Sequence, residues 1–338
     1  MATTVLVTGA TGFLGSNVLT ALAALPDVAA VAACRRPERL PAGFDGEVRA
    51  GDLDNPDYRR QVVKGVDVVC HAASAASMWG HARDERERFL APAVDLVDQA
   101  VEAGVGRFIL AGTVAMSAPP ERGVPLDDRA ETRPTGFWPH LDRLIDLDRH
   151  MAERAGEGTQ MVLLRLGHFV GVGNAVGLVP ALVPRLRTRL VPWLDRGRRR
   201  LPLVADTDLG AAFALAATAT GLADYESFHI IGPERPTLRE VVDHIAATAG
   251  CPRPWVSVPQ RLGYVAGGLM EKLPPVLPGR SPFLTRSIVY LCEDWYCTND
   301  RANQALGYAP RKDWRLAVDE QLRGLAADGY PWPRLSQF

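Results

Sequence analysis

The chain has 338 residues, of which 47% are apolar, and its formal net charge is −1. This length and apolar fraction suit one large domain and a smaller one around a sizeable core. The near-zero charge argues against a general binder of nucleic acids or of membrane surfaces. The five cysteines are odd in number and lack metal-ligand spacing. We therefore expect reduced thiols, a cytoplasmic protein and no metal site.

A glycine-rich turn between a predicted strand and a predicted helix is the first informative stretch. Val5–Val7 is a short apolar run typical of a buried strand, and Gly9, Gly12 and Gly15 follow at three-residue spacing before a helical apolar stripe that begins at Phe13. Free N–H groups and the helix dipole at such a helix start bind phosphate, and glycines let the backbone approach it. The turn predicts a dinucleotide-binding loop, with a surface glycine loop as the alternative.

Strands and helices alternate through the first half of the chain. This alternation predicts an α/β fold with a Rossmann-type, doubly wound parallel sheet. The expected strands are Val5–Val7, Val28–Cys34, Val48–Ala50, Val66–His71, Phe108–Ala111 and Met161–Leu166. The expected helices are Phe13–Leu25, Tyr58–Val63, Arg86–Ala103 and His140–Ala155.

The pattern changes after Gly167, where prolines break residues 168–205 into short pieces. A strand at Leu203–Ala205 and a helix from Asp206 to Ala219 should rejoin the main domain, and residues 228–231 predict one more strand. Thr237 and Glu240 predict a capping box ahead of a helix over 238–250. We expect residues 1–167, with 203–233 returning, to form the nucleotide domain. Residues 168–202 and 234–338 should form a smaller, mainly helical substrate lobe.

The segment Thr8–Gly15, with spacing Gly-x-x-Gly-x-x-Gly, resembles the nucleotide loop of the extended short-chain dehydrogenase/reductase family. The layout of the chain resembles that family over nearly its whole length. The resemblance implies a bound nicotinamide dinucleotide and a C-terminal lobe over its reactive end. The expected cofactor-binding residues are Gly9, Thr11, Gly12, Phe13, Leu14, Gly15, Arg35, Arg36, Asp52, Leu53, Ala72, Ala73 and Gly167.

Arg35 and Arg36 follow the second predicted strand, where the adenosine ribose lies in a dinucleotide fold. Two guanidinium groups suit a 2′-phosphate, so we predict NADPH/NADP as the cofactor, with a solvated loop as the alternative. The resemblance implies that Asp52 holds the adenine amino group. The alternative is an aspartate that caps a local turn.

Family members commonly pair a Ser or Thr after the fifth strand with a Tyr-x-x-x-Lys motif on the next helix. Thr113 matches the hydroxyl position, and Ser117 lies just beyond it. No tyrosine occurs between Tyr58 and Tyr225, and the only lysine in that interval is Lys64. The tyrosine and lysine pair is therefore absent.

An acidic residue often follows the family's lysine by four positions, and Asp148 fits that place. Counting back puts Leu144 at the lysine position and His140 at the tyrosine position. We therefore predict that Thr113, Ser117 and His140 orient or protonate a carbonyl oxygen.

Three interpretations of the missing pair stay open. The protein reduces a ketone, and the proton comes from His140, from water or from an acidic hydroxyl of the substrate itself. Alternatively, it binds NADP(H) without catalysis and acts as a redox-sensing regulator. In the third interpretation it is a nucleotide-sugar epimerase or dehydratase. The basic run Arg196–Arg200 is interpreted as a solvated loop, with a phosphate or nucleotide-sugar site as the alternative.

Aromatic residues in several predicted loops suit a large planar ligand, although packing between lobes also explains them. The chain resembles the atypical ketoreductases of aromatic polyketide pathways, which act on angucyclinone-like ketones without the usual tyrosine. This resemblance implies an antibiotic-biosynthesis oxidoreductase with a small-molecule aromatic substrate and no nucleic-acid or membrane partner. The family also suggests a homodimer. The expected substrate-binding residues are Ser74, Trp79, Met116, Phe137, Trp138, His168 and Phe169.

Overall fold

The computed structural model describes residues 2–74, 77–121, 123–272 and 282–329. The predicted substrate lobe also spans 273–281 and 330–338, which lie outside the described residues. No helix in the described ranges is long and apolar enough to cross a membrane.

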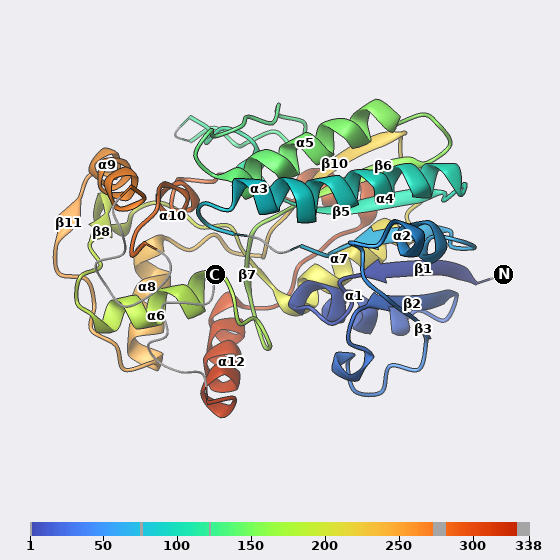
Figure 1. Cartoon of the computed structure of the whole chain (residues 1–338). Helices are drawn as coiled ribbons and strands as arrows, with labels where there is room; N and C mark the ends of the chain where they lie inside the picture. Colours follow the sequence, from blue (N-terminus) through green and yellow to red (C-terminus); the bar gives the residue numbers. More distant parts are fainter. Residues whose placement is uncertain (1, 75–76, 122, 273–281, 330–338) are drawn as a thin grey trace.

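A seven-stranded sheet forms the centre of the larger part, in the order β10-β6-β5-β4-β1-β2-β3 (Figure 1). Every neighbouring pair is parallel. The predicted doubly wound α/β fold is confirmed. The strands are β1 (Thr3–Thr8), β2 (Val28–Cys34), β3 (Glu47–Ala50), β4 (Val68–His71), β5 (Arg107–Thr113), β6 (Gln160–Leu166) and β10 (Tyr225–Ile230).

Helices cover both faces of this sheet, as a buried parallel sheet requires. Helices α4 and α5 lie on one face and α1 and α7 on the other (Figure 1). One core joins Leu96 and Leu141 to the sheet, and the other joins Val18 and Phe213 to it; all four side chains are 0% exposed. The helices here are α1 (Phe13–Ala23), α2 (Pro56–Val62), α3 (Ala82–Asp84), α4 (Ala91–Glu102), α5 (Pro139–Arg154), α7 (Asp206–Thr218) and α11 (Asp300–Leu306).

The smaller lobe has its own apolar core, at the left of Figure 1. Val183, Val241 and Val318 bring three helices together in this core. Two short parallel sheets, β7-β9 and β8-β11, complete the lobe. Its elements are β7 (His168–Val170), α6 (Leu178–Arg187), β8 (Trp193–Leu194), β9 (Leu203–Ala205), α8 (Leu238–Thr248), β11 (Ser257–Val258), α9 (Gln260–Met270), α10 (Arg286–Leu291) and α12 (Trp314–Ala327).

Helix α6 contradicts the expectation that prolines reduce residues 168–205 to short pieces. Pro180 lies in the first turn, where a backbone N–H has no partner within the helix. Pro184 lies inside the helix. Val179, Val183 and Leu186 are buried on one face, and this burial offsets the hydrogen bond lost at Pro184.

Two other segments differ from the sequence-based expectation. The strand β9 does not join the main sheet, because it pairs with β7, while the helix α7 that follows packs on α1 as expected. The helix predicted from Arg86 starts at Ala82 as α3 and passes through a π-helical turn, η2 (Glu85–Leu90), before α4. A π-helical turn contains an extra residue and changes where the flanking side chains point.

The contact between α1 and α7 depends on Gly210. A Cβ atom on Gly210 would lie 2.4 Å from the carbonyl oxygen of Asn17 in α1. The two helix backbones therefore lie so close together that only glycine fits at position 210.

We predict that Gly210→Ala lowers the free energy of unfolding by about 1–3 kcal/mol, because the backbone of α1 must shift. Urea denaturation measures this loss. Gly324→Ala is the matched control in α12, since its Cβ would lie 4.0 Å from the nearest heavy atom. The control should be neutral or stabilising by about 0.5–1 kcal/mol. Equal stability of the two variants would contradict the proposed helix contact.

Candidate active site

The glycine turn lies at the carboxyl end of β1 and leads directly into α1. Gly9 has φ +65°, and a Cβ there would lie 2.7 Å from the Cα of Ala73. A Cβ on Gly15 would lie 2.3 Å from the carbonyl oxygen of Gly9. Gly12 is the N-cap of α1 and makes no side-chain cap, so the first N–H groups of the helix face outward without a side-chain acceptor. The turn therefore fits the pyrophosphate of a dinucleotide.

The remaining predicted loop residues divide by burial. Thr11 and Phe13 are half-buried beside the turn, whereas the side chain of Leu14 belongs to the core under α1. Leu53 is also half-buried and packs against a core. Leu14 alone among these residues is restricted by burial to contacting a nucleotide mainly through its backbone.

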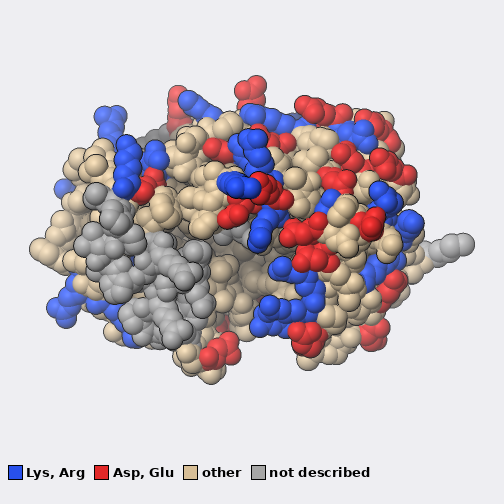
Figure 2. Space-filling model, in the orientation of Figure 1, with Lys and Arg blue, Asp and Glu red and all other residues tan. Residues whose placement is uncertain are grey.

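Arg35, Arg36 and Asp52 lie at the carboxyl ends of β2 and β3. Arg35 Nη1 is 3.8 Å from Asp52 Oδ2, and both side chains are well exposed. Asp52 Oδ1 also accepts a hydrogen bond from the backbone N–H of Asp54, so it caps the local turn as the alternative interpretation held. Figure 2 shows Lys and Arg side chains beside a hollow on this face of the molecule. The exposed guanidinium groups are available to an anion.

His140 lies at the start of α5, in contact with groups from two other elements. Its Nδ1 is 2.8 Å from Glu85 Oε2 on η2, and its Nε2 is 3.4 Å from Ser74 Oγ just beyond β4. The ring of Phe89 packs against the His140 ring with centroids 4.8 Å apart. Glu85 is 3% exposed and His140 is 7% exposed. The structure thus brings together two predicted residues, Ser74 and His140, and one that sequence reasoning missed, Glu85.

The carboxylate of Glu85 is surrounded by donors. The backbone N–H and the hydroxyl of Ser77 donate to Oε1 at 3.1 and 2.5 Å, and His140 Nδ1 faces Oε2. Burial alone would raise the pKa of Glu85, but these hydrogen bonds outweigh burial and hold the pKa below its ordinary value. Glu85 is therefore a buried carboxylate anion.

Local sequence fixes the start of α5. Asp142 accepts hydrogen bonds from the backbone N–H groups of Thr135 and Gly136. Trp138 donates its indole N–H to the carbonyl oxygen of Ser77, which ties this segment to the loop that holds Glu85. The sequence offered no signal for Glu85, because it is 55 positions from His140 and precedes the predicted helix start.

The strand β4 connects this array to the glycine turn. Ala72 and Ala73 are half-buried, and the Ala73 backbone lies against Gly9. Ser74 follows directly. The array and the dinucleotide loop therefore share the carboxyl edge of the sheet, where ligands bind in open α/β sheets.

Ser117 is not brought to this array. It is 1% exposed; its hydroxyl accepts a hydrogen bond from Arg165 and donates to the carbonyl oxygen of Ala130. It therefore has no surface for a substrate carbonyl, and its assignment as a carbonyl-orienting residue needs correction. Thr113 is half-buried at the end of β5, and its oxygen accepts the N–H of Ala115.

The predicted substrate-binding residues also divide by burial. Met116 is 0% exposed and Trp138 is 5% exposed, both within the core, so neither presents a face to a ligand. Phe137 is half-buried and packs edge-on against Tyr264 and Tyr290 of the lobe. Trp79 is half-buried in the loop before α3.

The segment after β6 lies over the cofactor side of the sheet. The ring of Phe169 is 6.0 Å from that of Phe13, and His168 Nε2 donates to the carbonyl oxygen of Leu291. A Cβ on Gly167 would lie 2.0 Å from the carbonyl oxygen of Pro202. The close approach of these two chain segments therefore requires glycine at position 167.

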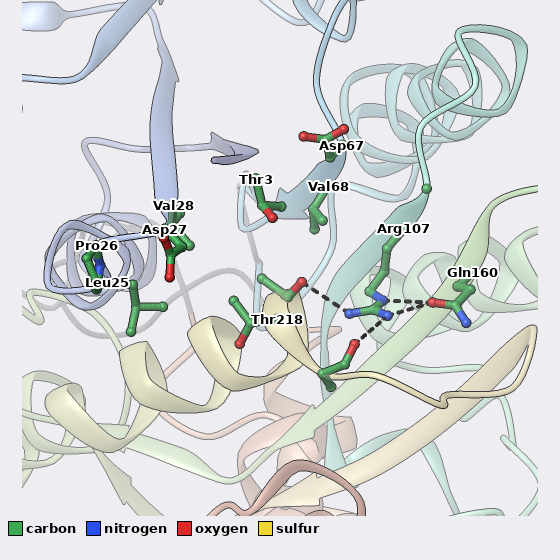
Figure 3. Close-up of a pocket in the computed structure, with 13 residues that line it drawn as sticks. Thr3, Leu25, Pro26, Asp27, Val28, Asp67, Val68, Arg107, Gln160 and Thr218 are labelled. Atoms are coloured by element: carbon green, nitrogen blue, oxygen red, sulfur yellow. Dashed lines mark hydrogen bonds between the residues drawn. The ribbon is translucent and has the colours of Figure 1, made fainter. Parts of the chain in front are cut away.

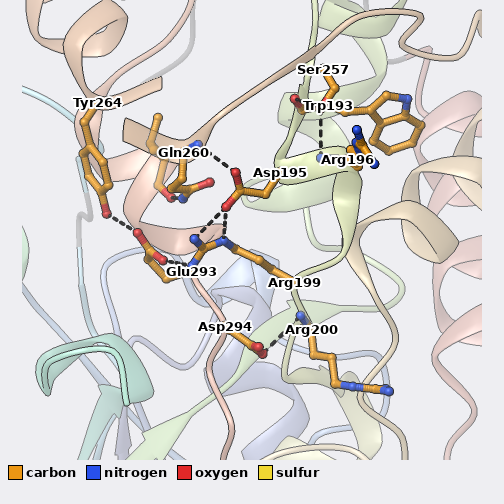
Figure 4. Close-up of polar contacts among 11 residues, drawn as sticks. Trp193, Asp195, Arg196, Arg199, Arg200, Ser257, Gln260, Tyr264, Glu293 and Asp294 are labelled. Carbon is orange, nitrogen blue, oxygen red and sulfur yellow. Dashed lines mark hydrogen bonds and ion pairs between the residues drawn. The ribbon is translucent and has the colours of Figure 1, made fainter. Parts of the chain in front are cut away.

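Within the basic run Arg196–Arg200, Arg199 is paired inside the protein, whereas Arg196, Arg198 and Arg200 are exposed. Arg199 forms ion pairs with Asp195 and Glu293, and the hydroxyl of Tyr264 donates to Glu293 (Figure 4). The backbone N–H of Gln260 donates to Asp195. This network joins α9 and the segment after α10 to the turn at 195–197. The positive charge of Arg199 is thus neutralised by ion pairs within the protein.

A hollow of about 570 Å³ lies at the amino ends of the strands, opposite the glycine turn (Figure 3). Arg107 lines it and donates to Gln160 and to the carbonyl oxygens of Ala216, Ala217 and Ala219. These bonds use the donors of the guanidinium group and cap the end of α7. The role of Arg107 in this hollow is therefore structural.

Fold and site together define a Rossmann-type dinucleotide-binding protein. Residues 5–230 match the NAD dependent epimerase/dehydratase family, and the chain belongs to that family.

Three curated relatives that match over most of this chain are reductases. The chain is 28% identical to a 2-alkyl-3-oxoalkanoate reductase of Stenotrophomonas maltophilia, over 96% of this chain and 98% of the relative. It is 25% identical to the protein of that name from Shewanella oneidensis, over 95% and 85%. It is 22% identical to the 4-hydroxy-2-methyl-3-oxo-4-farnesyl-3,4-dihydroquinoline-1-oxide ketoreductase of Stigmatella aurantiaca, over 93% and 94%. The resemblance to the short-chain dehydrogenase/reductase family is confirmed at the level of the epimerase/dehydratase family, and the relatives support an oxidoreductase.

Solved structures show the same fold. A nucleoside-diphosphate-sugar epimerase from Pseudomonas aeruginosa superposes with a TM-score of 0.77 at 16% identity, over 98% of this chain and 99% of the other. The UDP-glucose 4-epimerase of Thermus thermophilus, in complex with NAD, superposes with a TM-score of 0.68 at 20% identity, over 96% and 99%.

His71 gives this region a pH dependence. It is 3% exposed, its Nδ1 lies 2.8 Å from Thr8 Oγ1, and its Nε2 is buried with no hydrogen-bond partner among the described residues. Burial lowers the pKa of His71 to about 4. The unfolded chain therefore takes up this proton at a higher pH than the folded chain does.

We predict that the free energy of unfolding falls as the pH drops from about 6.5 towards 4, with His71 contributing on the order of 2–3 kcal/mol. The contribution is fully present above about pH 6.5, where His71 is neutral in both states. His71→Gln should remove this part of the pH dependence. Urea denaturation at several pH values measures it, and an unchanged slope in the variant would contradict the assignment.

Proposed function

We propose that the protein is an NADPH-dependent ketoreductase in which His140 gives a proton to the carbonyl oxygen. The observation that carries this proposal is a buried histidine, anchored by a carboxylate, beside the dinucleotide loop. His140 stands at the position that the sequence register assigns to the missing tyrosine. The reductases among the curated relatives support the same reaction class.

Each residue group has a separate task in this proposal. The turn from Gly9 to Gly15 binds the pyrophosphate, and Arg35 and Arg36 bind the 2′-phosphate. The bound cofactor supplies a hydride to the carbonyl carbon. Ser74 holds the carbonyl oxygen in place and His140 supplies the proton, so that charge does not accumulate on that oxygen.

The proposed substrate class is a bulky aromatic, polyketide-type ketone. Phe137 and Tyr264 are half-buried and pack edge to face next to the start of α5, an arrangement that suits a large planar ligand. The name of the Stigmatella aurantiaca relative describes a 3-oxo group on a dihydroquinoline. An angucyclinone-like ketone is the specific case that the sequence resemblance implies.

We predict that the protein oxidises NADPH in the presence of aromatic polyketide ketones, followed at the nicotinamide absorbance. His140→Ala should lower kcat by about 10²–10⁴-fold, which is the usual contribution of general acid catalysis. His150→Ala is the matched control on the same helix, because His150 contacts Asp98 away from the array.

Three outcomes would change this proposal. If His140→Ala turns over at the wild-type rate at every pH, the proton comes from an acidic hydroxyl of the substrate or from water. Binding of NADP(H) without turnover would favour a redox-sensing regulator. Conversion of a nucleotide sugar without net oxidation of the cofactor would favour an epimerase.

We also predict that Arg35→Ala raises the Kd for NADPH while leaving that for NADH nearly unchanged, because only NADPH carries the 2′-phosphate. Fluorescence titration of both cofactors measures the ratio. Arg60→Ala is the control, since Arg60 is an exposed arginine on α2 that pairs with Asp57. A parallel loss for both cofactors would show that Arg35 does not select NADPH.

A further inference from the structure

We propose that Ser74, His140 and Glu85 form a proton relay, in which the Ser74 hydroxyl touches the substrate oxygen and Glu85 acts as a positioning residue. This inference rests on the proposed ketoreductase function and goes beyond it. It names the group that contacts the substrate and the group that fixes which ring nitrogen of the histidine carries the hydrogen.

The Nδ1 atom of His140 carries the hydrogen in its contact with Glu85. Both oxygens of Glu85 are acceptors, Oε1 for Ser77 and Oε2 for His140. An ionised carboxylate has no proton to give, so His140 Nδ1 must be the donor. The Nε2 atom is then the one nitrogen of the ring that can take up or release a proton.

Two contacts set the orientation of the His140 ring. Glu85 and Phe89 are four residues apart, about one helical turn, and both contact His140. The hydrogen bond fixes one edge of the imidazole, and the Phe89 ring covers one face. The opposite edge, with Nε2, is thereby directed at Ser74.

Exposure differs sharply between His140 and Ser74. His140 is 7% exposed, whereas Ser74 is an exposed residue. A bulky ketone cannot reach a ring buried to this extent. The Ser74 hydroxyl lies between the buried nitrogen and the open side, and a hydroxyl can accept one proton while it donates another. Ser74 is therefore the group that the substrate oxygen meets.

The proposed step conserves protons and electrons. As the hydride from the reduced nicotinamide forms a C–H bond, the Ser74 O–H bond breaks and a new O–H bond forms on the substrate oxygen. The Nε2–H bond of the His140 imidazolium breaks, and its proton restores the Ser74 hydroxyl. The product is an alcohol, His140 ends as neutral imidazole, and its Nδ1–H stays with Glu85. The cofactor is the reductant and ends oxidised.

Charge favours this arrangement. From the elements packed against it, His140 faces the Glu85 carboxylate on η2, the neutral hydroxyl of Ser74 after β4 and the uncharged ring of Phe89. A carboxylate 2.8 Å away in a buried site stabilises the imidazolium that the step consumes. Loss of that charge should remove the preference for a hydrogen on Nδ1 of His140.

The experiment compares Ser74→Ala, Ser74→Thr and Glu85→Gln with the wild type. Ser74→Ala should lower kcat by about 10²-fold with little change in KM, and Ser74→Thr, which keeps a hydroxyl, should recover much of that loss. Glu85→Gln should lower kcat, because a neutral amide holds the Nδ1 hydrogen of His140 less strongly than a carboxylate does. Glu87→Gln is the matched control, because Glu87 is exposed on the same turn and pairs with Arg83.

A second readout needs neither cofactor nor substrate. Nitrogen-15 NMR of the free protein should show the hydrogen of the neutral His140 ring on Nδ1. Glu85→Gln should remove this preference, and Glu87→Gln should keep it.

The results separate the two proposals. If the wild type reduces ketones but Ser74→Ala does so at the same rate, the relay is wrong and the ketoreductase proposal stands. The relay is also wrong if His140 carries its hydrogen on Nε2 in the neutral wild type. If the wild type binds NADPH and reduces no ketone of the panel, the proposed function fails and the relay fails with it.

Discussion

The close approach of the Gly9 backbone to Ala73 is the constraint on which the rest of the site depends. A side chain at position 9 would place a Cβ 2.7 Å from the Cα of Ala73, in a backbone conformation that favours glycine. The contact therefore fixes the position of the dinucleotide loop relative to the end of β4. Since Ser74 follows Ala73, the same contact fixes where the hydroxyl lies beside the loop.

The second constraint is electrostatic. Burying an isolated carboxylate costs several kcal/mol unless donors replace the lost water. Glu85 is stable in its site because Ser77 supplies two donors and His140 a third. The polar groups of this array support one another, so removal of one leaves a buried neighbour with fewer hydrogen-bond partners.

Sequence patterns predicted the fold better than the site. The parallel sheet and its strands followed from the apolar runs and their alternation with helices, because burial on both faces imposes that pattern. The spacing from Asp148 indicated position 140. No pattern indicated Glu85, because its role depends on a contact between residues 55 positions apart and on a helical turn with irregular geometry.

Ser117, Met116 and Trp138 were also expected to face a ligand because they follow strands or lie in loops, yet each side chain is buried. Loop membership gives no information on which way a side chain points. Helix α6 was missed because tertiary burial outweighs the local effect of Pro184.

The π-helical turn at Glu85–Leu90 has a consequence for how such a site arises. π-turns are single-residue enlargements of an α-helix and occur frequently at functional sites. Removal of one residue would restore regular α geometry and rotate the preceding turn by about 100° about the helix axis. Glu85 would then leave the imidazole although every side chain of the array was still present. In this segment, then, the extra residue of the π-turn creates the contact between Glu85 and His140. Proteins that have the serine, the histidine and the glutamate but lack the extra residue would lack this contact.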